Sequence, residues 1–109
     1  CRAPMDDRAR RAAIAAVVRR HFGEVRACYE RGLFREAGLA GRLTLRWSID
    51  SDGVVSDVEV VGDELGAPAV SECVRRRPMH WRFPSSVGPA EVRYPFSFRA
   101  AEIADGASR

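Results

Sequence analysis

Three segments of the sequence alternate between apolar and polar residues, and this alternation limits the possible fold more than any other feature. They lie at residues 42–50, 54–61 and 90–99. A period of two places successive side chains on opposite faces of a strand, so each segment is expected to form a strand with one apolar and one wet face. Ser51-Asp52-Gly53 separates the first two segments and is typical of a hairpin turn.

Residues 7–36 have a helical period instead, because their apolar residues recur at steps of three and four. We expect one long amphipathic helix there. Gly23 lies in its middle and favours a bend or break, since glycine costs about 1 kcal/mol relative to alanine inside a helix. Gly38 is expected to end the helix, and Gly41 to complete the turn into the first strand.

A second, shorter helix is predicted at about residues 67–77. Pro68 suits its first turn, and Pro78 is expected to end it. The next apolar residues are expected to return to the core; they are Met79, Trp81 and Phe83. The order is therefore helix, strand, strand, helix, strand. This order predicts an α+β fold of two layers, in which both helices cover one face of a three-stranded antiparallel sheet.

The chain has 109 residues and is 46% hydrophobic, which is enough for one domain with a buried core. We expect residues 11–99 to form that domain, residues 1–10 to be an extension or linker stub, and residues 100–109 to be a loose tail. No apolar run approaches the roughly 20 residues of a membrane-spanning helix. Since residue 1 is Cys rather than Met, we expect a fragment or a processed form.

The 18 positive side chains are all arginine, which indicates a G/C-rich genome and weakens any arginine cluster as a sign of phosphate binding. The densest run, Arg75-Arg76-Arg77, has two interpretations: a nucleic-acid contact, or a helix end where cations complement the dipole. The strand aromatics fall on the apolar side of the strands, which favours the helix end. A basic nucleic-acid-binding module is the alternative function, and nucleic acid is not the expected partner.

Cys28 and Cys73 fall on the apolar stripes of the two predicted helices, so their thiols can meet over the sheet. A disulfide and two buried free thiols both fit these positions. A zinc site is disfavoured, because His21 and His80 each lie seven residues from a cysteine. That separation is roughly 10 Å along a helix, too far for both members to bind one ion. We expect no metal and no cofactor.

Catalytic motifs are missing from the sequence. It has no phosphate-binding glycine loop, no nucleophile elbow, no zinc-protease motif and no pair of carboxylates at neighbouring apolar positions. Asp50-Ser51-Asp52-Gly53 is faintly similar to a calcium loop but lacks the closing glutamate, and a hairpin turn explains it. We expect no enzymatic activity and no small-molecule substrate.

A sheet that is covered on one side offers two contact surfaces. Its edges carry unpaired backbone groups, to which an extended partner segment can add a strand. Pro95 indicates that the third strand is an edge, so the first predicted partner site comprises Glu91, Arg93, Pro95, Ser97 and Arg99. Pro95 equally fits an edge that is protected against pairing. The second surface is the polar face of the sheet around Arg46, Glu59 and Arg93.

Several motifs together resemble a known family. They are Cys28-Tyr29-Glu30, Gly41, Trp47-Ser48-Ile49-Asp50, Gly53-Val54-Val55, Cys73-Val74, Trp81-Arg82-Phe83-Pro84 and Tyr94-Pro95-Phe96-Ser97-Phe98. Over about residues 12–99 the chain resembles the AgmX/PglI C-terminal domain, a family that is itself similar to the C-terminal domain of TonB. The two cysteines and the two Pro-flanked aromatic motifs are the most specific features.

The resemblance implies a non-enzymatic interaction domain of a bacterial envelope protein, located in the periplasm and tethered to a membrane by a segment outside this sequence. Its partner would be an envelope or outer-membrane protein, in a gliding-motility or energy-transducing assembly. An oxidising periplasm also favours the Cys28–Cys73 disulfide. Cys1 has two interpretations, a lipidated residue and an arbitrary cut. A self-associating structural domain, forming a homodimer, is the third function class.

Overall fold

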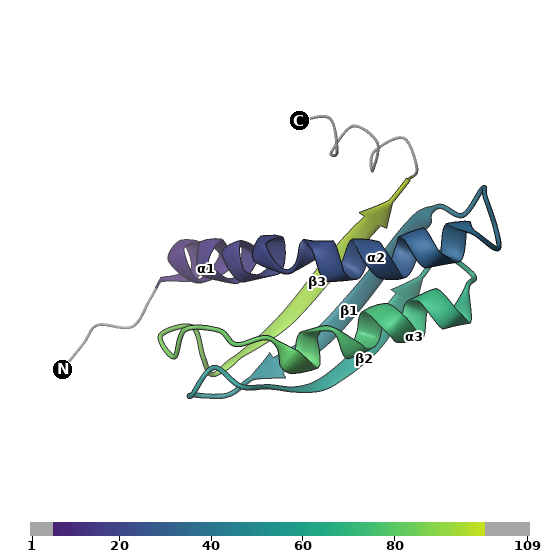
Figure 1. Ribbon diagram of the computed structural model, residues 1–109. Coiled ribbons are helices and arrows are strands. Elements are labelled where there is room, and N and C mark those ends of the chain that lie inside the picture. Colours follow the sequence, from purple (N-terminus) through teal and green to yellow (C-terminus); the bar gives the residue numbers. More distant parts are fainter. Residues whose placement is uncertain (1–5, 100–109) are drawn as a thin grey trace.

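The computed structural model describes residues 6–99, which form two layers (Figure 1). The elements are α1 (Asp7–Arg20), α2 (Phe22–Leu33), β1 (Gly41–Ile49), β2 (Val55–Asp63), α3 (Pro68–Arg76), a 3-10 turn (Pro78–His80) and β3 (Ala90–Phe98). The strands make one antiparallel sheet in the order β2-β1-β3. The helices cover one face of it, with α1 and α2 nearly end to end and α3 beside α2 (Figure 1). The predicted α+β fold class is confirmed.

The described residues include the start of the predicted domain and part of the expected N-terminal extension. α1 begins at Asp7, inside the segment 1–10 that was expected to be an extension, and Asp6 caps it by accepting a hydrogen bond from the Ala9 amide. Residues 1–5, and with them the two interpretations of Cys1, lie outside the described residues, as does the expected tail at 100–109. Between residues 6 and 99, no helix is long and apolar enough to cross a bilayer.

The core lies between the helices and the sheet, where the strands place their apolar side chains. Trp47 of β1 is completely buried, and Trp81 after α3 is 1% exposed. Tyr29 of α2 stacks on Phe98 of β3 with ring centroids 4.9 Å apart. The Tyr29 hydroxyl donates a hydrogen bond of 2.5 Å to the carbonyl of Leu39, which ties the loop after α2 to the core. The apolar faces of the strands and the apolar stripes of the helices therefore pack against each other, as the sequence predicts.

The prediction of one helix over residues 7–36 is wrong at two places. The helix breaks at His21 rather than at Gly23, and the His21 amide contacts the carbonyls of both Val17 and Val18 there. The His21 ring stacks on Trp81 at 5.1 Å, so the break lies against an aromatic residue from a distant part of the chain. α2 then ends at Leu33, well before Gly38, because the chain turns to bury Leu39.

Two further details after α3 differ from expectation. Pro78 ends α3 as predicted, but the chain continues into the 3-10 turn instead of a loop. Met79 lies on this turn and is 54% exposed, whereas it was expected in the core. The turn shifts the apolar pattern so that Pro78 is buried in its place, and Trp81 and Phe83 enter the core as predicted.

The β1–β2 connection is the predicted hairpin turn. The Asp50 carboxylate accepts hydrogen bonds from the amides of Asp52 and Val54, and these bonds, the one from Val54 first, lower the pKa of Asp50. Gly53 has a φ of +84° and packs directly against the chain at Phe83, where a Cβ atom would lie 1.9 Å from the Phe83 carbonyl oxygen. Only glycine fits this conformation and this close approach. The turn thus anchors the segment that carries Phe83.

Candidate functional site

β3 is an edge of the sheet, and it is the more regular of the two edges. Nine consecutive residues of β3 pair with β1, from Ala90 opposite Ile49 to Phe98 opposite Gly41, without a register shift. The edge that Pro95 predicts is therefore present. Its outer side runs the full length of the strand and is the surface that the sequence singled out as the first partner site.

The backbone of this strand has a definite orientation. Arg42 of β1 accepts a hydrogen bond of 2.9 Å from the Glu64 amide after β2, so the backbone groups of Arg42 point toward β2. Because backbone groups alternate along a strand, those of Leu43 point toward β3, where Phe96 lies opposite. The neighbours of Phe96 in turn point away from β1. The outward-facing positions of β3 are therefore Glu91, Arg93, Pro95 and Ser97.

This orientation explains how proline is accommodated in the strand. Pro95 lacks an N–H group, and its position places the missing donor on the outer side, where no bond to β1 is lost. Arg93 and Ser97 flank it and keep their outward N–H and C=O groups. Arg99 follows the end of the strand. All five side chains of the predicted partner site are exposed. A strand added along this edge would lack a backbone N–H donor at Pro95 only.

The other edge, β2, is poorly suited to pairing. Its register against β1 shifts twice, between Thr44 and Leu45 and between Arg46 and Ser48. At the second shift Asp57 adopts a φ of +56°, in the left-handed region that non-glycine residues rarely occupy. Such bulges bend an edge strand and interrupt its row of backbone groups. The two edges thus differ, and β3 is the one that presents a straight ladder.

The polar face of the sheet is a ladder of mixed charge, as the alternation predicts. Arg46 in the central strand forms ion pairs with Glu59 of β2 and Glu91 of β3. Hydrogen bonding to Glu59 is the main cause that raises the pKa of Arg46. Arg93 lies opposite Arg46 in the β1–β3 register. In the second predicted surface Arg46 and Glu59 therefore already pair across the strands, while Arg93 lies opposite another arginine.

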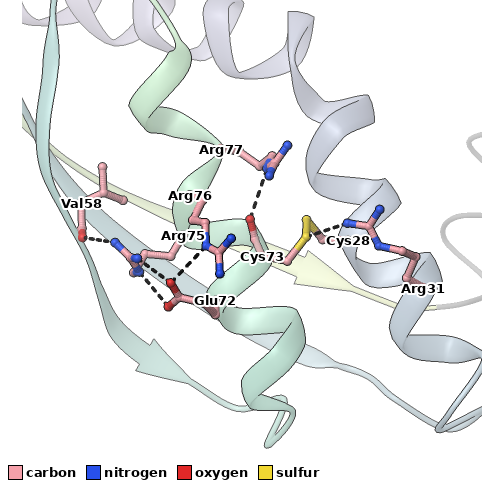
Figure 2. A network of polar contacts seen from close by, with 8 residues as sticks. All are labelled: Cys28, Arg31, Val58, Glu72, Cys73, Arg75, Arg76 and Arg77. Carbon is pink, nitrogen blue, oxygen red and sulfur yellow. Dashed lines mark hydrogen bonds and ion pairs between the residues drawn. A yellow bond between two sulfur atoms is a disulfide. The ribbon is translucent and has the colours of Figure 1, made fainter.

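A disulfide joins Cys28 of α2 to Cys73 of α3 (Figure 2). It is the pairing that the family resemblance implies, and it closes a sequence separation of 45 residues. Arg31, one turn after Cys28, donates a hydrogen bond of 3.0 Å to the Cys73 sulfur. Two of the helices that cover the apolar face of the sheet, α2 and α3, are thus covalently linked.

The arginine run Arg75-Arg76-Arg77, which follows Cys73 in the sequence, makes hydrogen bonds to nearby residues of α3. Arg75 and Arg76 both contact Glu72, at 2.5 and 3.3 Å, and these hydrogen bonds lower the pKa of Glu72 to about 2 (Figure 2). Arg77 donates to the carbonyl of Cys73 at 3.3 Å. The run therefore forms the end of a helix, with its cations near the last carbonyls and an acid of the preceding turn.

The two histidines do not converge with the cysteines. His21 contacts Glu24 through Nδ1 at 2.8 Å and stacks on Trp81, while His80 is exposed on the 3-10 turn. No group of three or more potential metal ligands occurs among residues 6–99. The cluster of Glu24, His21 and Trp81 was missed by the sequence analysis, because the side chains come from segments 57 residues apart, as the Trp81–Glu24 hydrogen bond shows.

Acid is expected to destabilise the domain through its hydrogen-bonded carboxyls. Burial alone would raise the pKa values of Glu24 and Asp63, but hydrogen bonds from His21 and Trp81, and from Ser71, Leu65 and Gly66, lower them overall. A lowered pKa means that the unfolded chain binds protons first as the pH falls. The contribution of these carboxyls to the free energy of unfolding should therefore be complete above about pH 5 and decrease toward pH 2.

Urea unfolding at a series of pH values measures this decrease. Glu24→Gln and Asp63→Asn each remove one titrating group, so each variant should show a shallower decrease than the parent chain. Glu36 is exposed and hydrogen-bonds through its backbone alone among residues 6–99, so Glu36→Gln serves as the control and should retain the parent slope. A parent slope in the two test variants would contradict the assignment.

Comparison with known proteins gives one structural similarity. No protein-family model matches the sequence, and a search of curated proteins finds no match. Among solved structures, the chain is similar to the C-terminal domain of TonB from Helicobacter pylori, determined by NMR in solution. The two are 14% identical in sequence, the match covers 88% of this chain and 95% of that one, and the TM-score is 0.44.

Proposed function

We propose that the chain is a non-enzymatic protein-interaction domain that binds an extended segment of an envelope protein along the outer side of β3. The single observation that carries this proposal is the nine-residue ladder between β1 and β3, which leaves the outward groups of β3 in an uninterrupted row except at Pro95. Strand addition uses such a row, with backbone hydrogen bonds for affinity and alternate side chains for specificity.

The finer features of this proposal rest on the resemblance of the sequence motifs to the AgmX/PglI C-terminal domain. They are a periplasmic location, a tether to the membrane outside this sequence, and a role in a gliding-motility or energy-transducing assembly. The Cys28–Cys73 disulfide is consistent with an oxidising compartment. The bulged β2 edge supports β3 as the contact surface, because it leaves one straight edge for a partner.

Substitution of an outward-facing residue by proline tests the proposed edge. Arg93→Pro removes one outward N–H group and leaves the bonds of the neighbouring residues to β1 in place. We expect partner binding to weaken by about tenfold, because a backbone hydrogen bond and the alignment around it are lost. Arg93→Ala keeps the amide and is the matched control. Pro95→Ala restores a donor and should strengthen binding.

Photo-crosslinking in the native host provides the measurement. A photoreactive amino acid at Ser97 should capture a defined envelope protein in cells, and Arg93→Pro, but not Arg93→Ala, should abolish the product. The same probe at Ser56 reports on the β2 edge. Products from Ser56 alone would contradict the proposal. A product that contains a second copy of this chain would instead support the self-associating domain, and cross-linked nucleic acid would support the basic module.

A further inference from the structure

A groove of about 580 Å³ lies between α2 and α3, and no residue of the sheet lines it. The Cys28–Cys73 disulfide lies in its wall, as do Gly32 and Val70. Gly32 packs so closely on Val70 that a Cβ atom at this position would lie 2.4 Å from a Val70 methyl group. The two helices therefore approach each other at a small residue, and the groove opens beside their contact.

The charge around this groove is strongly positive. Four arginines and one glutamate line it; they are Arg31, Arg35, Arg76, Arg77 and Glu72. This excess of three positive charges equals the net charge of the entire chain, which has 18 basic and 15 acidic side chains. The charges of all other residues therefore cancel. This cancellation is a sum over the chain, and α1 has a basic excess of its own, with five arginines and one aspartate in Asp7–Arg20.

The positions of the guanidinium groups matter as much as their number. Arg31 donates a hydrogen bond to the Cys73 sulfur and Arg77 donates one to the Cys73 carbonyl, so the two guanidinium groups lie on either side of the disulfide (Figure 2). Arg76 shares Glu72 with Arg75. Within residues 6–99, Arg31, Arg35 and Arg77 have no carboxylate at ion-pair distance. The cations thus surround the groove and come from both helices; Arg76 pairs with Glu72 and the charge of Arg77 acts on Glu24, whereas Arg31 and Arg35 have no ion pair within residues 6–99.

An apolar surface accompanies these charges. Phe34, the residue after α2, lines the groove and is 91% exposed, the highest value among the large hydrophobic side chains of the described chain. Ala69 of α3 is also exposed and lines the opposite side, with Val70 beneath it. Large apolar side chains next to arginine are typical of protein contact surfaces.

We propose that this groove binds an acidic peptide segment of a partner protein. One apolar side chain of the segment enters beside Phe34 and Val70, and its flanking carboxylates pair with Arg35 and Arg76. Arginine forms bidentate hydrogen bonds with carboxylates, which suits a ligand of this kind. The site lies on the helix layer, apart from the β3 edge, so one partner or two can occupy both surfaces.

The arrangement favours a peptide over other anionic ligands. A single phosphate group would need the guanidinium groups to converge on one point, whereas here they are spread around apolar walls and tied to Cys73 and Glu72. A nucleic-acid backbone or a bilayer surface makes contact through an extended charged face, and neither supplies an apolar side chain at the centre of a concave site. A segment with both acids and one large apolar residue matches the groove.

Fluorescence anisotropy with short labelled peptides, composed of Asp and Glu around one Leu or Phe, tests the proposal on the whole chain. Arg35→Gln with Arg76→Gln should weaken binding by about tenfold, since two charged contacts are lost. The matched control, Arg19→Gln with Arg20→Gln on α1, makes the same change in net charge outside the groove and should bind like the parent. Circular dichroism confirms that both variants fold.

The apolar part of the site has its own test. Phe34→Ser should weaken peptide binding by about fivefold, whereas Met79→Ser, at the next most exposed large hydrophobic residue within residues 6–99, should not. Arg93→Pro at the β3 edge should leave peptide binding unchanged, so this test is independent of the proposed function. Equal losses in the groove variants and their controls would overturn the proposal. So would tighter, groove-dependent binding of a DNA oligonucleotide or of vesicles with anionic lipids.

Discussion

Reduction of the Cys28–Cys73 disulfide is expected to lower the free energy of unfolding by about 4 kcal/mol. The bond closes a separation of 45 residues, and in the chain-entropy model a cross-link of this span removes much of the freedom of the unfolded chain. The enclosed segment contains β1, β2 and the start of α3. Reduction therefore frees about half of the domain in the unfolded state while leaving the side chains of the folded state almost unchanged.

Urea titrations of oxidised and reduced protein, in a Cys1→Ser background that prevents exchange with the terminal thiol, measure this difference. The urea dependence should also become steeper on reduction, because the unfolded chain then exposes more surface. Cys28→Ala with Cys73→Ala should match the reduced chain. Intact mass after alkylation verifies the starting state. A difference below about 1 kcal/mol would contradict the prediction, since the entropic effect of this loop is several times larger.

The elements of the fold that were predicted correctly depend on local patterns. Alternation indicates β1 and β3, and Asp50 with Gly53 indicates the turn, because these features depend on neighbouring residues alone. The break at His21 coincides with stacking against Trp81, far along the chain, and no local pattern marks this contact. The bulges in β2 arise where Asp57 leaves the regular strand conformation, and no residue pattern marks that position.

The candidate site shows the same division. Pro95 identifies β3 as an edge from the sequence, since proline is tolerated mainly there, but the direction of its backbone follows only from the register with β1. The groove between α2 and α3 was not predicted. Arg31 and Arg76 are far apart in sequence and each resembles an ordinary helix-end cation. Only the packing of the helices, with Gly32 against Val70, brings the arginines together.

Trp81→Ala is expected to have the largest effect of any single substitution, a loss of about 5 kcal/mol from the free energy of unfolding. Trp81 is 1% exposed, stacks on His21 and meets Trp47 edge to face, with centroids 5.1 and 6.0 Å apart. Its Nε1–H donates to Glu24 at 3.1 Å. Truncation leaves a large cavity and a Glu24 carboxylate that keeps only its contact with His21, and it removes the ring on which His21 stacks between α1 and α2.

Substitution of each buried tryptophan by phenylalanine separates the contribution of packing from that of the hydrogen bond to Glu24. Trp81→Phe keeps an aromatic ring but loses the bond to Glu24, whereas the Nε1–H of Trp47 has no hydrogen-bond partner within residues 6–99. Trp47→Phe thus removes a buried donor that was never satisfied, which offsets part of the lost packing. We expect Trp81→Phe to cost about 1–2 kcal/mol more than Trp47→Phe, although both side chains are equally buried. Thermal or urea unfolding of the two variants measures the difference, and Glu24→Ala, which removes the acceptor, should remove most of it. Equal costs in the two variants would mean that packing alone, and not the hydrogen bond to Glu24, accounts for the importance of Trp81.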